Sequence, residues 1–171
     1  MSRAVDQTKL RNAGILLGLG LGGFFDGIVL HQLLQWHHMV SSVEFFSPET
    51  VPGLRTNTLA DGLFHAVTYI FTVLGVALLW RALRTGERGT GRQLIGLALL
   101  GWGLFNVVEG IVDHHLLQLH HVKEQSDHRL AWDLAFLLWG AAMFLGGWSL
   151  YRTDQAGGAG ERPVSGPPAN A

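Results

Sequence analysis

The sequence predicts an all-α integral membrane protein, a four-helix bundle whose helices all cross the bilayer. Hydrophobic residues make up 48% of the 171-residue chain and charged residues only 15%, against roughly 25% charged residues in an ordinary soluble domain. The apolar residues gather into long runs, and a helix of about 20 such residues spans a hydrocarbon core about 30 Å thick. Four runs are long enough to do so, at about residues 13–36, 59–82, 94–119 and 130–151.

The first run is interpreted as a helix of the mature protein. Three basic residues precede it, as in a secretory signal peptide, but it is longer than the apolar segment of such peptides and lacks a convincing A-x-A cleavage site. Gly14, Gly18 and Gly22 recur at four-residue spacing, which lets one face of a helix approach its neighbour closely. The neighbour is either another helix of this chain or a second copy, so a homo-oligomer through this Gly-rich face is one prediction.

The remaining segments are predicted to be a loop and a tail. The connection at residues 39–57 contains VEFFSPETVPGL, whose two phenylalanines and two prolines indicate a loop that rests on the outer membrane face or caps the bundle. An ordinary loop fits equally well. The chain after the fourth run is rich in Gly, Pro and Ala without apolar periodicity. Residues 153–171 are therefore predicted to be disordered, and residues 10–152 to form the transmembrane domain.

The basic residues predict the orientation of the four helices. Nine of the twelve Lys and Arg side chains fall on one side of the membrane and three on the other, and the side richer in basic residues is normally cytoplasmic. Both termini are therefore expected in the cytoplasm, with the histidine-rich ends outside. The nine are Arg3, Lys9, Arg11, Arg81, Arg84, Arg88, Arg92, Arg152 and Arg162, and the three are Arg55, Lys123 and Arg129.

The first and third runs end in copies of the same polar motif. Moving the sequence by 83 positions, from residue 26 to residue 109, lays DGIVLHQLLQWHHM over EGIVDHHLLQLHHV. Such self-similarity indicates a duplicated unit, here a helical hairpin, and two copies of equal topology should be related by a pseudo-twofold axis along the membrane normal. The matched polar residues are Asp26 and Glu109, His31 and His114, Gln35 and Gln118, His37 and His120, and His38 and His121.

The second and fourth runs each carry one ionisable residue that matches by position. Aligning Trp80 with Trp148 places His65 of the second run over Asp133 of the fourth. Straight helices that rise 1.5 Å per residue then place the polar residues at three levels in the outer half of the bundle. Asp26 and Glu109 lie lowest, the paired histidines lie highest, and the level between them holds His31, His65, Asp113, His114 and Asp133.

These polar residues predict a transition-metal site. An isolated ionisable side chain at the bilayer centre costs roughly 2.5 to 3.5 kcal/mol on insertion scales, so several together need a shared compensation. Imidazole and carboxylate ligands from facing helices suit copper, zinc or iron, and the chain has no cysteine to add a thiolate. We favour Cu or Zn, with Fe next. The predicted ligands are Asp26, His31, His37, His38, His65, Glu109, Asp113, His114, His120, His121 and Asp133.

Three other interpretations stay open. A membrane redox enzyme could hold two irons, although ferritin-like bundles use Glu-x-x-His pairs and this chain places His31 five residues after Asp26. Bis-histidine haem ligation, for instance between His31 and His114, is also conceivable. A proton or metal-ion transporter would use such residues too, but the inner half of the bundle has almost no polar residues. The last interpretation is a hydrogen-bond network that only fastens the helices.

The motifs GFFDGIVLHQLLQWHH and VVEGIVDHHLLQLHH, together with DGLFH, resemble an uncharacterised family of small bacterial membrane proteins known as a domain of unknown function. The resemblance covers roughly residues 10–150. It implies the four-helix membrane fold and a location in the bacterial inner membrane, and it supplies no activity. The expected role is metal sensing, holding or delivery to an envelope metalloenzyme or metal chaperone, with no nucleic-acid partner.

Overall fold

The chain folds into long helices, and its computed structural model describes residues 7–160, with side chains as far as Thr153. The described residues contain no strand, so the all-α prediction is confirmed. Two π-helical segments, η1 and η3, continue directly from the ends of α1 and α3. The elements are α1 (Thr8–Phe25), η1 (Asp26–Leu33), the 3-10 turn η2 (Glu44–Phe46), α2 (Val51–Arg84), α3 (Gly91–Glu109), η3 (Gly110–Leu116) and α4 (Arg129–Gly160).

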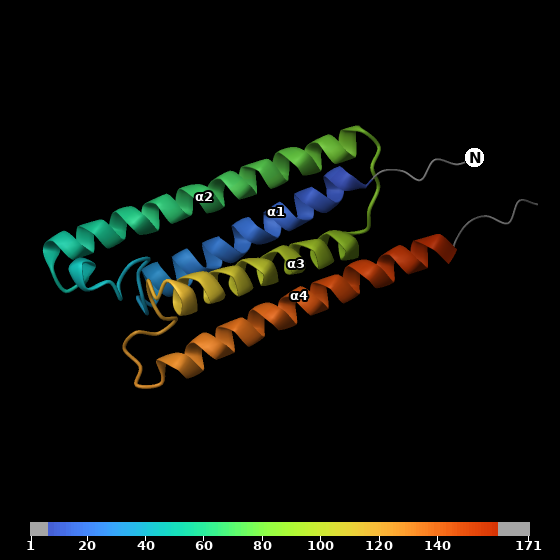
Figure 1. Cartoon of the computed structure of the whole chain (residues 1–171). Coiled ribbons are helices and arrows are strands. Elements are labelled where there is room, and N and C mark those ends of the chain that lie inside the picture. Colours follow the sequence, from blue (N-terminus) through green and yellow to red (C-terminus); the bar gives the residue numbers. More distant parts are fainter. Residues whose placement is uncertain (1–6, 161–171) are drawn as a thin grey trace, which may run out of the picture.

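The four helices form two hairpins that meet along α1 and α3. Helix α1 packs against α2 and α3, and α3 packs against α4, whereas no contact joins α2 to α4 in the described part of the chain. Figure 1 shows the two central helices with α2 and α4 on either side of them. Each helix is long and apolar enough to cross a membrane. The predicted bundle of two duplicated helical hairpins is therefore confirmed.

Glycines allow α1 and α3 to approach each other closely. A Cβ atom on Gly18 would overlap the carbonyl oxygen of Ala98, and one on Gly101 would overlap the carbonyl oxygen of Ile15. Gly18 and Gly101 are themselves related by the 83-residue shift, since 18 + 83 = 101. The other two glycines of the predicted motif also face α3. The Gly-rich face of α1 therefore packs inside this chain, against its own repeat.

The ends of α2 and α4 differ from the sequence prediction. Helix α2 begins at Val51 rather than near residue 59, because the side chain of Thr50 accepts a hydrogen bond from Gly53 N at 3.1 Å and Pro52 occupies the first turn. Helix α4 continues to Gly160, so the first part of the predicted disordered tail is helical. The rest of that tail lies outside the described residues.

The C-terminal ends of α1 and α3 change from α-helix to π-helix and then reverse direction. The backbone bond that ends η1 runs from Leu34 N to the carbonyl of Val29 at 2.8 Å, five residues back, and η3 ends in the same way. The next residue in each copy, Gln35 or Gln118, has a left-handed backbone with φ of 49° and 50° respectively. The chain therefore turns back toward the bundle, and the histidines that follow point inward.

Candidate metal centre

Four buried side chains from both repeats converge between the C-terminal ends of α1 and α3. They are His31 of η1, Glu109 at the end of α3, and His37 and His120 from the two reversed segments. One ligand atom of each lies within 4.8 Å of the others. The rings of His37 and His120 are stacked, with centroids 4.5 Å apart and planes 2° from parallel. Three imidazoles and one carboxylate are thus gathered around a single point.

Hydrogen bonds fix the orientation of the two stacked imidazoles. The Nδ1 atom of His37 lies 2.8 Å from the carbonyl oxygen of Val122, and Nδ1 of His120 lies 3.0 Å from that of Met39. A carbonyl oxygen can only accept, so Nδ1 carries the proton in both rings. The Nε2 lone pairs therefore point to the centre, which is the tautomer that binds a metal ion. A backbone carbonyl of each repeat thus accepts a hydrogen bond from the histidine of the other repeat. These two hydrogen bonds join the two copies of the motif.

The third imidazole of the group is held by a buried carboxylate on α2. Asp61 accepts hydrogen bonds from Nδ1 of His31 at 2.9 Å, from Nδ1 of His38 at 2.7 Å and from Met39 N at 2.9 Å. A carboxylate that holds the outer nitrogen of a ligand histidine fixes the ring and raises its basicity. Asp61 therefore supports the group without being a member of it.

Asp133 on α4 has the same place in the second repeat. It accepts from Nδ1 of His121 at 2.7 Å and from Val122 N at 2.9 Å, and it lies 3.7 Å from Nδ1 of His114. The expected equivalence of His65 with Asp133 is therefore wrong, because Asp61 makes the matching contacts. His65 instead directs Nδ1 to the backbone carbonyl of Asp61 at 2.7 Å.

Asp61 is the supporting residue that sequence reasoning missed. The connection before α2 is longer than the one before α4, so the 83-residue shift does not hold for the partner helices, and the correct shift is 133 − 61 = 72. The pattern D-x-x-F in both helices could have found it. The phenylalanine of each pattern packs on a site histidine, Phe64 on His31 and Phe136 on His114, with ring centroids 5.7 and 5.3 Å apart.

Asp26 and His114 border the group of four. Oδ2 of Asp26 lies 2.9 Å from Nε2 of His31, and its Oδ1 lies 3.9 Å from Nε2 of His37. In the second repeat, Oε1 of Glu109 lies 3.6 Å from Nε2 of His120. The ring of His114 lies 4.8 Å from that of His120. Both repeats therefore bring a carboxylate and two histidines to the same region.

The three separate levels expected from straight helices are not found. His37 and His120 contact Asp26 and Glu109 directly, because the chain reverses at the left-handed glutamine of each motif. The other predicted ligands lie around this region, and Asp113 is half-buried and outside the group of four. His38, His121 and Asp133 lie next to it as hydrogen-bonding partners.

Many polar atoms of the centre have no hydrogen-bond partner. A buried polar group left in this way costs about 1 to 3 kcal/mol, so a cluster of them indicates that something else satisfies it. The close Asp26–His31 approach does not have hydrogen-bond geometry. In the described part of the chain, the buried atoms without a partner are Oδ1 and Oδ2 of Asp26, Nε2 of His31, Nε2 of His37, Oε1 and Oε2 of Glu109, both ring nitrogens of His114, Nε2 of His115 and Nε2 of His120.

The two histidines that follow the transmembrane segments are neutral at neutral pH. Burial lowers the pKa of His120 to about 4. Burial, together with the neighbouring imidazole of His120, lowers the pKa of His37 well below its ordinary value. A neutral imidazole offers its lone pair, whereas a protonated one repels a cation. Both rings are therefore ready to bind a metal ion without first losing a proton.

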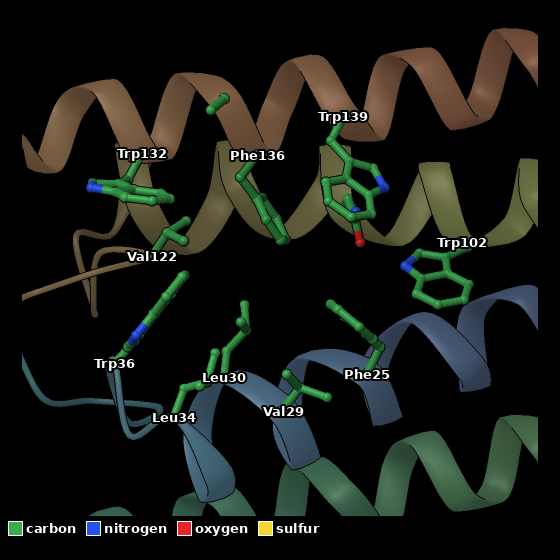
Figure 2. Close-up of a pocket in the computed structure, with 12 residues that line it drawn as sticks. Phe25, Val29, Leu30, Leu34, Trp36, Trp102, Val122, Trp132, Phe136 and Trp139 are labelled. Carbon is green, nitrogen blue, oxygen red and sulfur yellow. The ribbon is translucent and has the colours of Figure 1, made fainter.

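An apolar cavity of about 270 Å³ lies beside the centre, between the end of α1 and α4. Figure 2 shows Trp36 and Leu30 on one side of it facing Trp132 and Phe136 on the other. The ammonium group of Lys123 lies 4.7 Å from the centroid of the Trp36 ring and 5.0 Å from that of Trp132. Phe136 also packs on a histidine of the centre, so one layer of side chains separates the cavity from the polar cluster.

The comparison with known proteins agrees with this architecture. Residues 13–154 match the model of a family described as a predicted membrane protein (DUF2243), and this range includes most of α1 and α4, all of α2 and α3, and every residue of the centre. The chain has no match among curated proteins or among solved structures. The chain therefore belongs to DUF2243, a family of predicted membrane proteins.

Proposed function

We propose that this membrane protein binds a transition-metal ion through His31, His37, Glu109 and His120. One observation carries the proposal: the four ligand atoms lie within 4.8 Å of one another, all buried. None of them has a hydrogen-bond partner among the described residues. A bound ion coordinates all of these lone pairs. Coordination removes the free-energy cost of leaving buried polar atoms without partners.

The ligand types narrow the choice of ion. Three imidazoles and one carboxylate suit Zn, Cu(II) or Fe, whereas magnesium and calcium prefer oxygen ligands alone. A bare ion is favoured over haem because His37 and His120 stack on each other at 4.5 Å. The ring of His31 lies 4.4 Å from that of His37. A porphyrin would have to separate these rings.

We propose that the protein lies in the bacterial inner membrane with both termini in the cytoplasm. Arg81, Arg84, Arg88 and Arg92 surround the connection between α2 and α3, at the end of the bundle far from the centre. Positive charge favours the cytoplasmic side, so the metal centre lies in the outer half of the membrane. An ion bound there lies on the envelope side of the membrane. The role of the protein is to hold the ion, to sense it, or to deliver it to an envelope metalloenzyme or metal chaperone.

A second candidate function is that of a membrane redox enzyme. The observation that favours it is the aromatic cavity beside the centre, since Phe136 lines that cavity and contacts His114. An apolar substrate dissolved in the membrane could reach this cavity without crossing water. Turnover of such a substrate would distinguish an enzyme from a protein that only holds its metal.

Thermal unfolding with added Zn²⁺ tests the proposed function. The full chain is purified in detergent, stripped with EDTA and heated with increasing Zn²⁺. Specific binding stabilises the folded state by about 2.7 kcal/mol when the free ion is 100-fold above its dissociation constant, so the melting temperature should rise. His120→Ala should abolish the rise, and the exposed His128→Ala should keep it. An unchanged melting temperature of the wild-type chain would refute metal binding.

A further inference from the structure

One ion on the group of four leaves part of the centre unexplained. Both carboxylate oxygens of Asp26 and both ring nitrogens of His114 are buried, and none has a hydrogen-bond partner in the described part of the chain. Asp26 is 1% exposed and His114 is also 1% exposed. Each such atom carries the same penalty as those that the first ion would satisfy. These side chains are therefore available to a second ligand.

The two repeats bring the same three side chains to the centre. In each, a carboxylate lies where the α-helix changes to the π-helical segment, one histidine lies in that segment and one follows the reversal. The carboxylate lies 3.9 Å from the second histidine in the first repeat and 3.6 Å in the second, and the two histidine rings lie 4.4 and 4.8 Å apart. The two sets are Asp26, His31 and His37, and Glu109, His114 and His120.

The six side chains are spread over more than one coordination sphere. A first-row ion holds nitrogen and oxygen ligands at about 2.0 to 2.2 Å, so the ligand atoms of one ion gather within roughly 4 to 5 Å of one another. The group whose ligand atoms lie within 4.8 Å of one another contains neither Asp26 nor His114. One ion therefore accounts for at most four of the six side chains.

We propose that the centre is dinuclear, with one ion on the two histidines and the carboxylate of each repeat. The proposal rests on the proposed metal-binding function and divides the four ligands of that function between two ions. Asp26 and Glu109 each lie within 4 Å of one of the two stacked histidines, so the two ions would be close neighbours. Each ion then has the two-histidine, one-carboxylate ligand set that leaves coordination positions open. The bound ions are two divalent first-row transition-metal ions. Their open coordination positions take water or a small molecule.

The number of ions per chain tests this proposal without any substitution. The full chain is stripped with EDTA, loaded with excess Zn²⁺, desalted and analysed for zinc and protein by mass spectrometry. Two equivalents per chain are expected. One equivalent would overturn the second site and leave the proposed function intact, and no retained zinc would overturn both.

Substitution of His114 separates the two accounts further. A single ion on the group of four does not use His114, so His114→Ala would leave the zinc content unchanged, which would overturn the dinuclear centre. The dinuclear centre predicts a twofold fall, from two equivalents to one, and the same fall for His31→Ala in the other repeat. The exposed His128→Ala is the matched control and should keep two equivalents.

A second variant keeps the proposal falsifiable if His114→Ala does not fold. Asp26→Asn preserves the size of the side chain and removes the negative charge, so it weakens the ion of the first repeat. Its zinc content should fall to about one equivalent while its elution from a sizing column stays that of the wild-type chain. Retention of both equivalents by folded Asp26→Asn would overturn the assignment of Asp26.

Discussion

At the scale of single residues, the centre depends on which nitrogen of each imidazole faces inward. His37 and His120 direct Nδ1 to backbone carbonyls of the opposite repeat, and His31 directs Nδ1 to Asp61. These partners fix the rings before any ion arrives, so little conformational entropy is lost on binding. The inward Nε2 atoms and Glu109 then form a preorganised ligand set.

The partner of His31 gives a prediction at this scale. Asp61→Ala removes the acceptor of four hydrogen bonds and frees the ring of His31, so zinc affinity should fall by about 10- to 100-fold. A competitive titration of Zn²⁺ with a chromophoric chelator measures the change. Asp127→Ala, at an exposed site in the connection before α4, should leave the affinity as it is. Equal affinities of the two variants would show that Asp61 does not support the centre.

At the scale of elements, the reversal after each π-helical segment brings the second histidine of each motif into the centre. The sequence shows the repeat of this motif but not the reversal, since glutamine is an uncommon residue for a left-handed backbone. A helical period carried through residues 34–38 therefore placed His37 and His38 too far from Asp26. The duplication of Gln35 and Gln118 can be seen in the sequence. The reversal of the chain at these residues depends on backbone angles, which a pattern of side chains does not show.

The left-handed glutamines predict an asymmetry between two substitutions. Gln35→Gly should be neutral or slightly stabilising because glycine adopts φ near 49° without strain. Gln35→Val should lower the free energy of unfolding by about 1 to 2 kcal/mol, because a β-branched residue clashes in this conformation. Thermal unfolding in detergent compares the two, and the same pair at Gln118 provides a repeat measurement. If valine were tolerated as well as glycine, the reversal would not have this backbone.

The contact of α1 with α3 predicts a second asymmetry, between two glycines. Gly18→Ala places a Cβ against the backbone of Ala98 and should destabilise the chain by about 1 to 3 kcal/mol. Gly62 in α2 has open space around its Cβ position, so Gly62→Ala should be neutral or stabilising by up to about 1 kcal/mol. Thermal unfolding measures both. Similar melting temperatures for the two variants would contradict the close packing of α1 on α3.

At the scale of the whole molecule, the fold could be predicted from the sequence further than the centre could. Four apolar runs and an 83-residue shift were enough to predict two membrane hairpins, because the length of each span and the duplication can be seen in the sequence itself. Asp61 was missed because the longer 39–57 connection changes the shift to 72. Which residues of two helices lie next to each other depends on loop length and packing, and hydropathy gives no information on either.

The orientation of the whole molecule gives a further prediction. The chain has no cysteine, so single cysteines report their own side of the membrane. In intact cells, Asp127→Cys should react with a membrane-impermeant maleimide and Arg88→Cys should not, because the latter lies in the arginine-rich connection between α2 and α3. Inverted vesicles should show the opposite pattern. Labelling of Arg88→Cys in intact cells would reverse the proposed orientation.

The most direct test of the account is to locate the metal itself. Crystals of the full chain grown with Zn²⁺ are measured at the zinc absorption edge. The account predicts an anomalous difference peak about 2.0 to 2.2 Å from the Nε2 atoms of the site histidines, with Glu109 as a further ligand. Ordered side chains of His31, His37 and His120 around a site without anomalous signal would contradict it.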